Sequence, residues 1–211
     1  GQATMRLFYL IPLFFLLPLQ LGAQSFHAAV KGGIAATQVS GDNLSGYDQF
    51  GGLVGGVVGI PVGKKIDLNL EILFVQKGSR KTADPDNEDY TEYLLRLNYF
   101  EFPVLLQYKH SDRIALEAGP IIGALVSSKE EDQNGPFYWN QPRPFDRIEV
   151  GAGGGIQYRF ADNFSVVSRF ETSILPIRPH LSGQTYRWNR GQYNTVLLFA
   201  LQYRFNKTAA P

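Results

Sequence analysis

The sequence predicts an all-β protein, an eight-stranded antiparallel up-and-down transmembrane β-barrel with short periplasmic turns and long extracellular loops. Apolar residues recur at every second position from Phe26 to Phe205, and no stretch keeps the spacing of an amphipathic helix. Eight such segments follow one another, and the connections between them alternate strictly between short and long. Outer-membrane barrels have this alternation of short turns and long loops.

Composition limits the classes of function. The chain has 211 residues, which is enough for one domain, and its net charge of +1 argues against a nucleic-acid partner. Zero Cys excludes a disulfide framework, a thiolate metal site and a Cys nucleophile. No cofactor motif is present, so we expect no cofactor.

The N-terminal segment predicts export. Met5 is the single Met, and the basic Arg6 and a short apolar run follow it. Residues 5–23 then form a signal peptide ending at Ala23, and residues 1–4 lie upstream of it. A retained membrane anchor is the alternative, against which Pro12 and Pro18 argue. We expect the barrel to occupy residues 24–205 and a C-terminal tail to occupy residues 206–211.

The eight strands are placed by alternation. The clearest is the last, in which Leu197, Phe199 and Leu201 share one face with aromatic residues. The predicted strands are 26–38, 49–62, 65–77, 94–109, 114–127, 147–160, 164–176 and 192–205. An even number of strands places both termini on the short-turn side, which would be periplasmic.

Volume decides which face points outward. A soluble barrel of the lipocalin kind also alternates over eight strands, with its apolar face inward. The interior of such a barrel has room only for its own side chains, and eight sets of Leu, Ile, Phe and Tyr would overfill it. The other face, rich in small residues with one or two charges per strand, fits inside. We therefore predict the apolar face toward lipid.

The inward face carries charges of both signs that nearly cancel, and buried charges persist when they are paired. We predict an ionic plug in the lumen. Its predicted members are Lys31, Lys77, Arg147, Arg159, Arg169 and Arg204 with Asp67, Glu71, Glu101, Glu117, Glu149 and Glu171. A structural plug is favoured over a proton relay or catalytic carboxylates, the other use of buried acids beside Arg.

Aromatic residues gather at the strand ends on the short-turn side. They are Tyr108, Tyr158, Phe160, Tyr203 and Phe205. Rings at one level are typical of the girdle at a membrane interface. Tyr203 and Phe205 also end the last strand, which we predict to be the barrel-insertion strand.

Several phrases in order resemble a known family. They are EILFVQKGSRK at 71–81, YFEFPVLLQY at 99–108, GPIIGALVS at 119–127, VGAGGGIQYRF at 150–160 and a closing LQYRF. Together they resemble the PorT-like outer-membrane β-barrel domain of Bacteroidetes, over essentially the whole mature chain. The resemblance implies an eight-stranded barrel inserted by the barrel-assembly machinery, and one branch serves a protein-secretion system. The chain departs from a usual insertion signal because residues 206–211 follow Phe205.

Motifs for other chemistry are weak. The glycines of GAGGG at 151–155 lie in a strand with no helix after them, so they favour close packing over phosphate binding. Asp84, Asp86 and Glu88 have acidic spacing like a calcium loop but lack its glycine and closing Glu. His27, His110 and His180 are too scattered for a metal triad. A lipid-modifying enzyme would use His180 with Ser182 and Glu171.

Two long loops carry exposed aromatic residues beside Arg and Pro. They are Phe137, Tyr138, Trp139, Tyr186 and Trp188. This composition is typical of a recognition surface, although the rings could equally fold over the barrel mouth. We predict a non-enzymatic accessory or scaffold subunit of an outer-membrane secretion, assembly or transport complex. Its partners are outer-membrane lipid, the barrel-assembly machinery and another protein. A lipid-modifying enzyme and a ligand-binding or permeation barrel are the alternatives.

Overall fold

The computed structural model describes residues 26–40, 49–83, 88, 90–136, 144–179 and 191–205. Eight long strands form the molecule: β1 (His27–Ser40), β2 (Gln49–Pro61), β3 (Ile66–Lys81), β4 (Tyr93–Lys109), β5 (Ile114–Asp132), β7 (Ile148–Arg159), β8 (Phe164–Ser173) and β10 (Gly191–Arg204). Two short strands, β6 (Gly135–Pro136) and β9 (Arg178–Pro179), pair with β5 and β10. No helix among these residues is long and apolar enough to cross a membrane.

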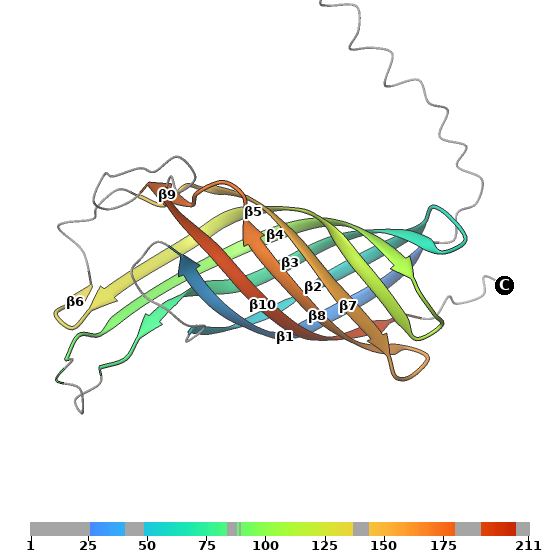
Figure 1. The fold of residues 1–211 in the computed structure, drawn as a ribbon, viewed down its shortest axis with the longest axis horizontal. Coiled ribbons are helices and arrows are strands. Elements are labelled where there is room, and N and C mark those ends of the chain that lie inside the picture. The colour runs from blue at the N-terminus through green and yellow to red at the C-terminus, as the bar shows by residue number, and fades with distance from the viewer. Residues whose placement is uncertain are drawn as a thin grey trace, which may run out of the picture.

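The sheet closes on itself. Each long strand pairs antiparallel with its neighbour in sequence, and β1 pairs with β10 from Ala29 opposite Arg204 to Ser40 opposite Tyr193. A closed ladder leaves no strand edge unpaired in the barrel wall. The turns at 62–65, 110–113 and 160–163 lie at one end, where the described chain also begins and ends (Figure 1). We call this the short-turn end and the opposite one the long-loop end. The predicted fold class is confirmed.

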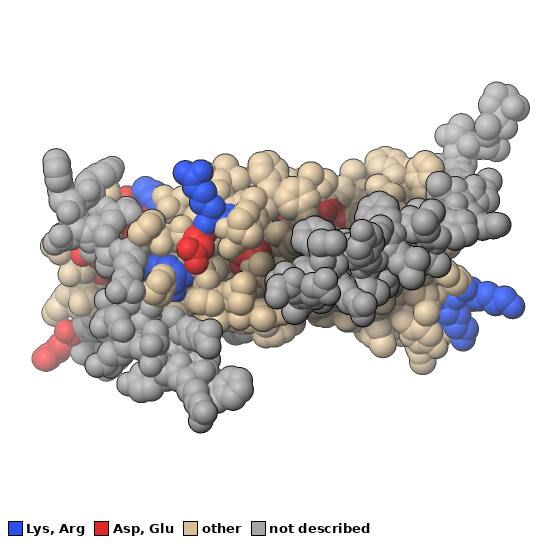
Figure 2. Space-filling view, turned by 90° about the horizontal axis from the view of Figure 1, so that it is seen from above, with Lys and Arg blue, Asp and Glu red and all other residues tan. Residues whose placement is uncertain are grey.

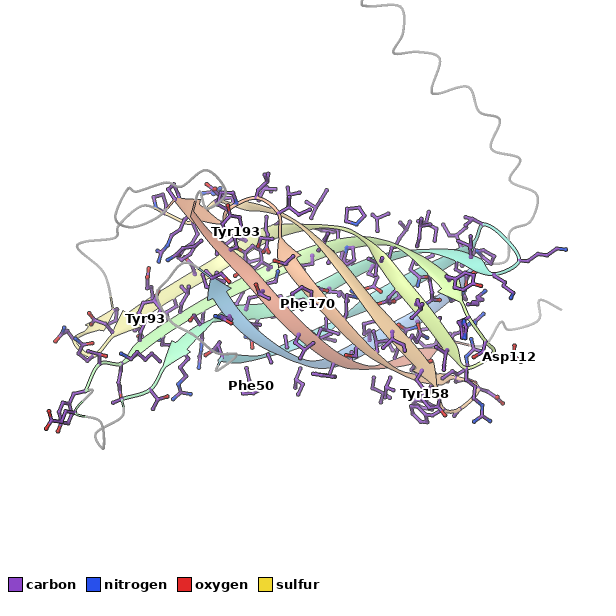
Figure 3. The ribbon with its side chains drawn as sticks, viewed as in Figure 1. Phe50, Tyr93, Asp112, Tyr158, Phe170 and Tyr193 are labelled. Carbon is purple, nitrogen blue, oxygen red and sulfur yellow. The ribbon has the colours of Figure 1, made fainter. Side chains whose placement is uncertain are left out.

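The apolar face of every strand points outward. Val30, Val54, Phe170 and Phe199 are each 46–60% exposed, whereas Asp67 and Glu71 are 1–5% exposed. Figure 3 shows Phe50 projecting away from the barrel. A large exposed apolar surface around a barrel is what contact with lipid requires. Figure 2 shows this wall as mostly uncharged atoms, with Lys and Arg projecting at the short-turn end on the right.

An aromatic belt surrounds part of the short-turn end. Phe160 stacks on Phe164 with ring centroids 6.1 Å apart, Phe164 lies 5.0 Å from Tyr203, and Tyr203 meets Phe205 edge to face at 5.4 Å. Tyr158 is exposed at the same end (Figure 3). The rings of β7, β8 and β10 therefore lie at one level, as an interfacial belt does.

Two strands continue farther than their alternation predicts. Strands β3 and β5 extend to Lys81 and Asp132, where residues from 78 and 128 onward were expected to be loops. The pairing of β4 with β5 shifts at Val126, an extra residue that reverses which side chains of β5 point inward. The period-two pattern loses its phase there, although the backbone ladder continues into polar sequence.

The lumen holds an apolar cluster as well as charged side chains. Inward residues of β1, β2, β3 and β10 make the apolar cluster of Ala35, Leu53, Leu73, Val75, Val196, Leu198 and Ala200. Inward residues of β4, β5, β7 and β8 contribute the buried charged side chains Glu101, Glu117, Glu149, Arg169 and Glu171. Space for Arg169 depends on Gly155, where an added Cβ would lie 2.4 Å from the Ser168 carbonyl oxygen and 2.9 Å from Arg169 Cα. A glycine at this position lets strand β8 approach closely enough for Arg169 to fill the lumen.

Candidate functional site: a sealed ionic lumen with two different ends

Arg169 of β8 is the centre of the lumen. Its guanidinium donates Nη1–H and Nη2–H to the two carboxylate oxygens of Glu71 at 3.0 and 2.9 Å, and Nε–H to Glu117 at 2.7 Å. Lys31 Nζ donates to Glu71 at 2.6 Å, and Glu171 lies 3.3 Å from Arg169 Nη1. All five side chains are at least 95% buried. One Arg therefore links β1, β3, β5 and β8 across the barrel through charge-assisted contacts.

Lys77 of β3 centres a second cluster, nearer the long-loop end. Its ammonium pairs with Glu101 and donates to both oxygens of Glu149 at 3.0 and 3.1 Å. Glu149 also accepts hydrogen bonds from Ser173 at 2.7 Å and Asn194 at 2.9 Å. Among the described residues, the two clusters fill the cross-section of the barrel with bonded side chains, as the narrow lumen of eight strands leads one to expect.

The predicted balance of charge inside the lumen is wrong. Three predicted cations, Lys31, Lys77 and Arg169, lie in the two clusters with five carboxylates. Arg147 is exposed, because it lies in the bend before β7 instead of in the ladder. Arg159 and Arg204 are only half-buried, because each ends its strand at the short-turn mouth. The middle of the barrel therefore holds fewer cations than predicted, because Arg159 and Arg204 lie at the short-turn mouth instead.

The short-turn mouth opens into a cavity of about 450 Å³, which we call the vestibule. Gln107 donates to Gln157 at 2.6 Å across its inner end, and Asp67 accepts a hydrogen bond from Lys109 at 2.7 Å beside it. Sequence patterns did not single out Lys109, because it stands at the boundary between strand and turn. The vestibule ends at the bonded lumen and is therefore a blind cavity.

The long-loop end is closed by a brace centred on Arg178, which follows β8 in the short strand β9. Its guanidinium donates to both oxygens of Glu130 at 3.0 and 2.9 Å, and its Nε–H donates to Gln192 at 2.6 Å. Tyr93 donates to Glu130 at 2.6 Å, and Phe145 lies under the guanidinium with 4.1 Å from its centroid to Arg178 Cζ. The brace joins chain segments on either side of the two Trp-bearing loops.

An apolar residue completes this closure. Ile177 has no exposed surface and packs with Val39, Leu95, Leu97 and Tyr99 at the top of the lumen. Its carbonyl accepts the Asp146 amide at 2.7 Å, and its amide donates to Gln192 at 2.8 Å. The segments that flank the third and fourth long loops therefore fold inward over the mouth.

Glu130 is the carboxylate of the brace. It lies outside the membrane-facing part of β5, because the apolar outer face of that strand ends at Val126. Burial alone would raise the pKa of Glu130, but hydrogen bonds from Arg178 and Tyr93 and the guanidinium charge outweigh it, so the pKa lies below its ordinary value. The carboxylate is thus ionised, and the brace intact, at neutral pH.

Neither Glu130 nor Arg178 was predicted from the sequence. Glu130 follows the extra residue at Val126, and Arg178 stands between two prolines in a stretch without alternation. Tyr99, which lies with its ring centroid 5.1 Å from the Lys77 ammonium, was read only as part of a family phrase. The available signal was that Glu130 and Arg178 each precede a long loop with aromatic residues.

Several predicted residues lie outside the described residues: the loop aromatics Phe137, Tyr138, Trp139, Tyr186 and Trp188, and also His180, Ser182, Asp84 and Asp86. The predicted signal peptide 5–23 and the tail 206–211 also lie outside them. Within the described ranges, no group of three or more His, Asp or Glu side chains is arranged to hold a metal ion. Glu171 lies in the Arg169 cluster.

A closed eight-stranded barrel with an apolar outer wall and a sealed charged lumen defines a small outer-membrane β-barrel protein. Residues 22–177 match the family described as the outer membrane protein beta-barrel domain. The chain belongs to this family, whose match covers most of its length. None of the functionally curated proteins matches the sequence significantly.

Solved structures share the fold at low identity. The crystal structure of Ail, the attachment invasion locus protein of Yersinia pestis, is 12% identical, with a TM-score of 0.50 over 85% of this chain and 98% of that one. Neisserial surface protein A is 10% identical, with a TM-score of 0.50 over 85% of this chain and 97% of that one. At such identity the likeness establishes the barrel architecture alone.

Proposed function

We propose that this protein is a non-enzymatic accessory or scaffold subunit of an outer-membrane complex, docking a protein partner through its long-loop end. The observation that carries the proposal is the brace of Arg178, Glu130, Gln192 and Phe145. It fixes the stems of the two loops that hold Trp139 and Trp188. A surface held in place before binding loses less entropy on association, which favours recognition by these loops.

The remaining surfaces support this assignment. The wall is apolar and suits lipid, and each carboxylate of the two lumen clusters pairs with a Lys or Arg inside the barrel. In this proposal the signal peptide is removed after export, and the barrel-assembly machinery inserts the chain through its last strand, ending at Tyr203 and Phe205. Both termini then lie in the periplasm and the long loops outside. The resemblance to the PorT-like branch suggests that the complex takes part in secretion, assembly or transport.

The decisive experiment extracts the complex in mild detergent and compares what accompanies the barrel. Replacing Trp139 and Trp188 with Ala removes the two largest anchors, and truncation of a true hot spot costs more than about 2 kcal/mol of binding. We expect loss of the partner with normal insertion. Phe160→Ala, an exposed aromatic at the other end, is the matched control. A partner retained by the Trp variant would leave the lipid-facing wall as the docking surface.

Planar-bilayer recording tests the permeation alternative. Because bonded side chains fill the lumen between the vestibule and Ile177, we expect no steady conductance from the purified barrel. Reproducible open-channel steps would favour a transport barrel. An activity on lipid that His180→Ala abolishes would favour the lipid-modifying enzyme.

A further inference from the structure

The vestibule at the short-turn mouth has a charge unlike that of the rest of the molecule. Six Lys and Arg side chains line it, with Asp112 as the single lining carboxylate, although the whole chain carries a net charge of only +1. The cations are Lys64, Lys65, Lys109, Arg113, Arg159 and Arg204. Lys64, Lys65 and Arg113 lie in the first two short turns, whereas Lys109, Arg159 and Arg204 end the strands β4, β7 and β10. Figure 3 places Asp112 at this end.

Two of these cations lack a paired carboxylate. Lys109 is paired with Asp67, but among the described residues no carboxylate lies within ion-pair distance of Arg159 or Arg204. Two carboxylates deeper in the lumen, Glu71 and Glu117, are already bound by Arg169. Half-buried cations without partners are costly to keep, and a bound anion would offset that cost.

The direction of the side chains indicates where the anion would bind. Arg159 and Arg204 share the inward parity of Gln157 and Gln202 on their strands, whereas Tyr158 and Tyr203 share the outward parity. Cations meant for the headgroups of the surrounding bilayer would need the outward parity. Charges focused inside a low-dielectric blind cavity instead concentrate an anion that enters the mouth.

We propose that the vestibule binds a soluble phosphate-bearing anion. Two or three guanidinium groups give the planar, two-point donors that phosphate oxygens accept, and lysines at the rim add charge around them. The cavity of about 450 Å³ has room for a phosphorylated small molecule. This site lies at the opposite end from the loops and is independent of the proposed docking function.

The test uses the full barrel in nanodiscs of phosphatidylcholine, with inorganic pyrophosphate as the probe and calorimetry as the measurement. We expect saturable binding that the double substitution Arg159→Gln with Arg204→Gln weakens at least about tenfold, because it removes two charge-assisted donors. Arg96→Gln, an exposed cation near the long-loop end, is the matched control and should leave binding unchanged. Lys65→Gln, in an exposed turn, should weaken binding without touching the strands.

A second arm separates two sources of phosphate. If the site takes a soluble anion, the affinity for pyrophosphate in nanodiscs that contain phosphatidylglycerol should be only slightly lower than in phosphatidylcholine nanodiscs. If pyrophosphate does not bind, and the vestibule variants bind less anionic lipid than the parent protein does, the vestibule is a phosphate site for a lipid headgroup and the soluble ligand is ruled out. Absence of both, or equal weakening by Arg96→Gln, would overturn the proposal. Folding of each variant is checked by the mobility difference between unheated and heated samples.

Discussion

Arg169 and Arg178 each grip a glutamate through two guanidinium nitrogens, and each is almost fully buried. Arg169 lies at mid-lumen and joins four strands that are far apart in sequence, whereas Arg178 lies above the apolar wall and joins the stems of loops. The first contact belongs to the barrel itself. The second belongs to the segment of Ile177 and Arg178 that covers the long-loop mouth, which we call the lid. We therefore expect the Arg169–Glu71 contact to control the global stability of the barrel, and the Arg178–Glu130 contact to control only the local order of the loop stems.

The largest effect is expected from Arg169→Met. The substitution removes the cation shared by Glu71, Glu117 and Glu171, and breaking a buried ion pair in this way typically costs about 3 to 5 kcal/mol. We expect the free energy of unfolding to fall by that amount in denaturant titrations followed by gel mobility. Glu171→Gln, whose contact with Arg169 is 3.3 Å, is the milder control. A variant as stable as the parent would mean that the network does not support the barrel.

Arg178→Met should have a smaller and local effect. It removes charged hydrogen bonds worth about 1.5 to 3 kcal/mol each, but the strands keep their ladders. Hydrogen exchange should accelerate at the amides of Asp146 and Ile177, which are held by the segments that the brace joins. Exchange in mid-barrel strands should stay unchanged. Global unfolding at the same denaturant concentration as the Arg169 variant would abolish the distinction between plug and lid.

The sequence predicted the first of these sites far better than the second. Arg169 and Glu71 stand in strands whose alternation is unbroken, so their inward direction could be read directly. Glu130 follows an extra residue at Val126 that reverses the alternation, and the pattern assigned it to a loop. A period of two specifies a face only while the register is continuous.

Charge at the ends of the barrel was also beyond sequence patterns. Arg147 and Arg204 have the inward parity, but parity does not tell whether a residue at a strand end still has the opposite wall beside it. The structure leaves Arg147 exposed and Arg204 half-buried. Which carboxylate each cation meets depends on the stagger between distant strands, and local sequence does not encode that stagger.

Acidification should weaken the Glu130–Arg178 contact, because it protonates Glu130, and should leave the neutral hydrogen bonds of the barrel unchanged. Because the pKa of Glu130 is lower in the folded protein than its unfolded value of about 4.3, the brace contributes fully above that value. Its contribution is lost as the pH falls through the lowered folded pKa. Exchange at the Ile177 amide, corrected for intrinsic rates, should therefore rise at strongly acidic pH. Arg178→Met should remove most of this dependence, and a parent protein without it would argue against an ionised brace.

The smallest effect should come from a pair next to the brace. Lys129 lies 2.9 Å from Glu131 on β5, but their side chains are 58% and 26% exposed, so solvent and salt screen the contact. Lys129→Gln should change the free energy of unfolding by no more than about 1 kcal/mol, with any difference shrinking at high salt. Glu130, the residue between them, faces inward to Arg178, so the two pairs test burial at nearly the same place in the chain. If Lys129→Gln accelerated exchange at Ile177 as much as Arg178→Met, local charge alone, and not the buried two-point contact, would hold the lid.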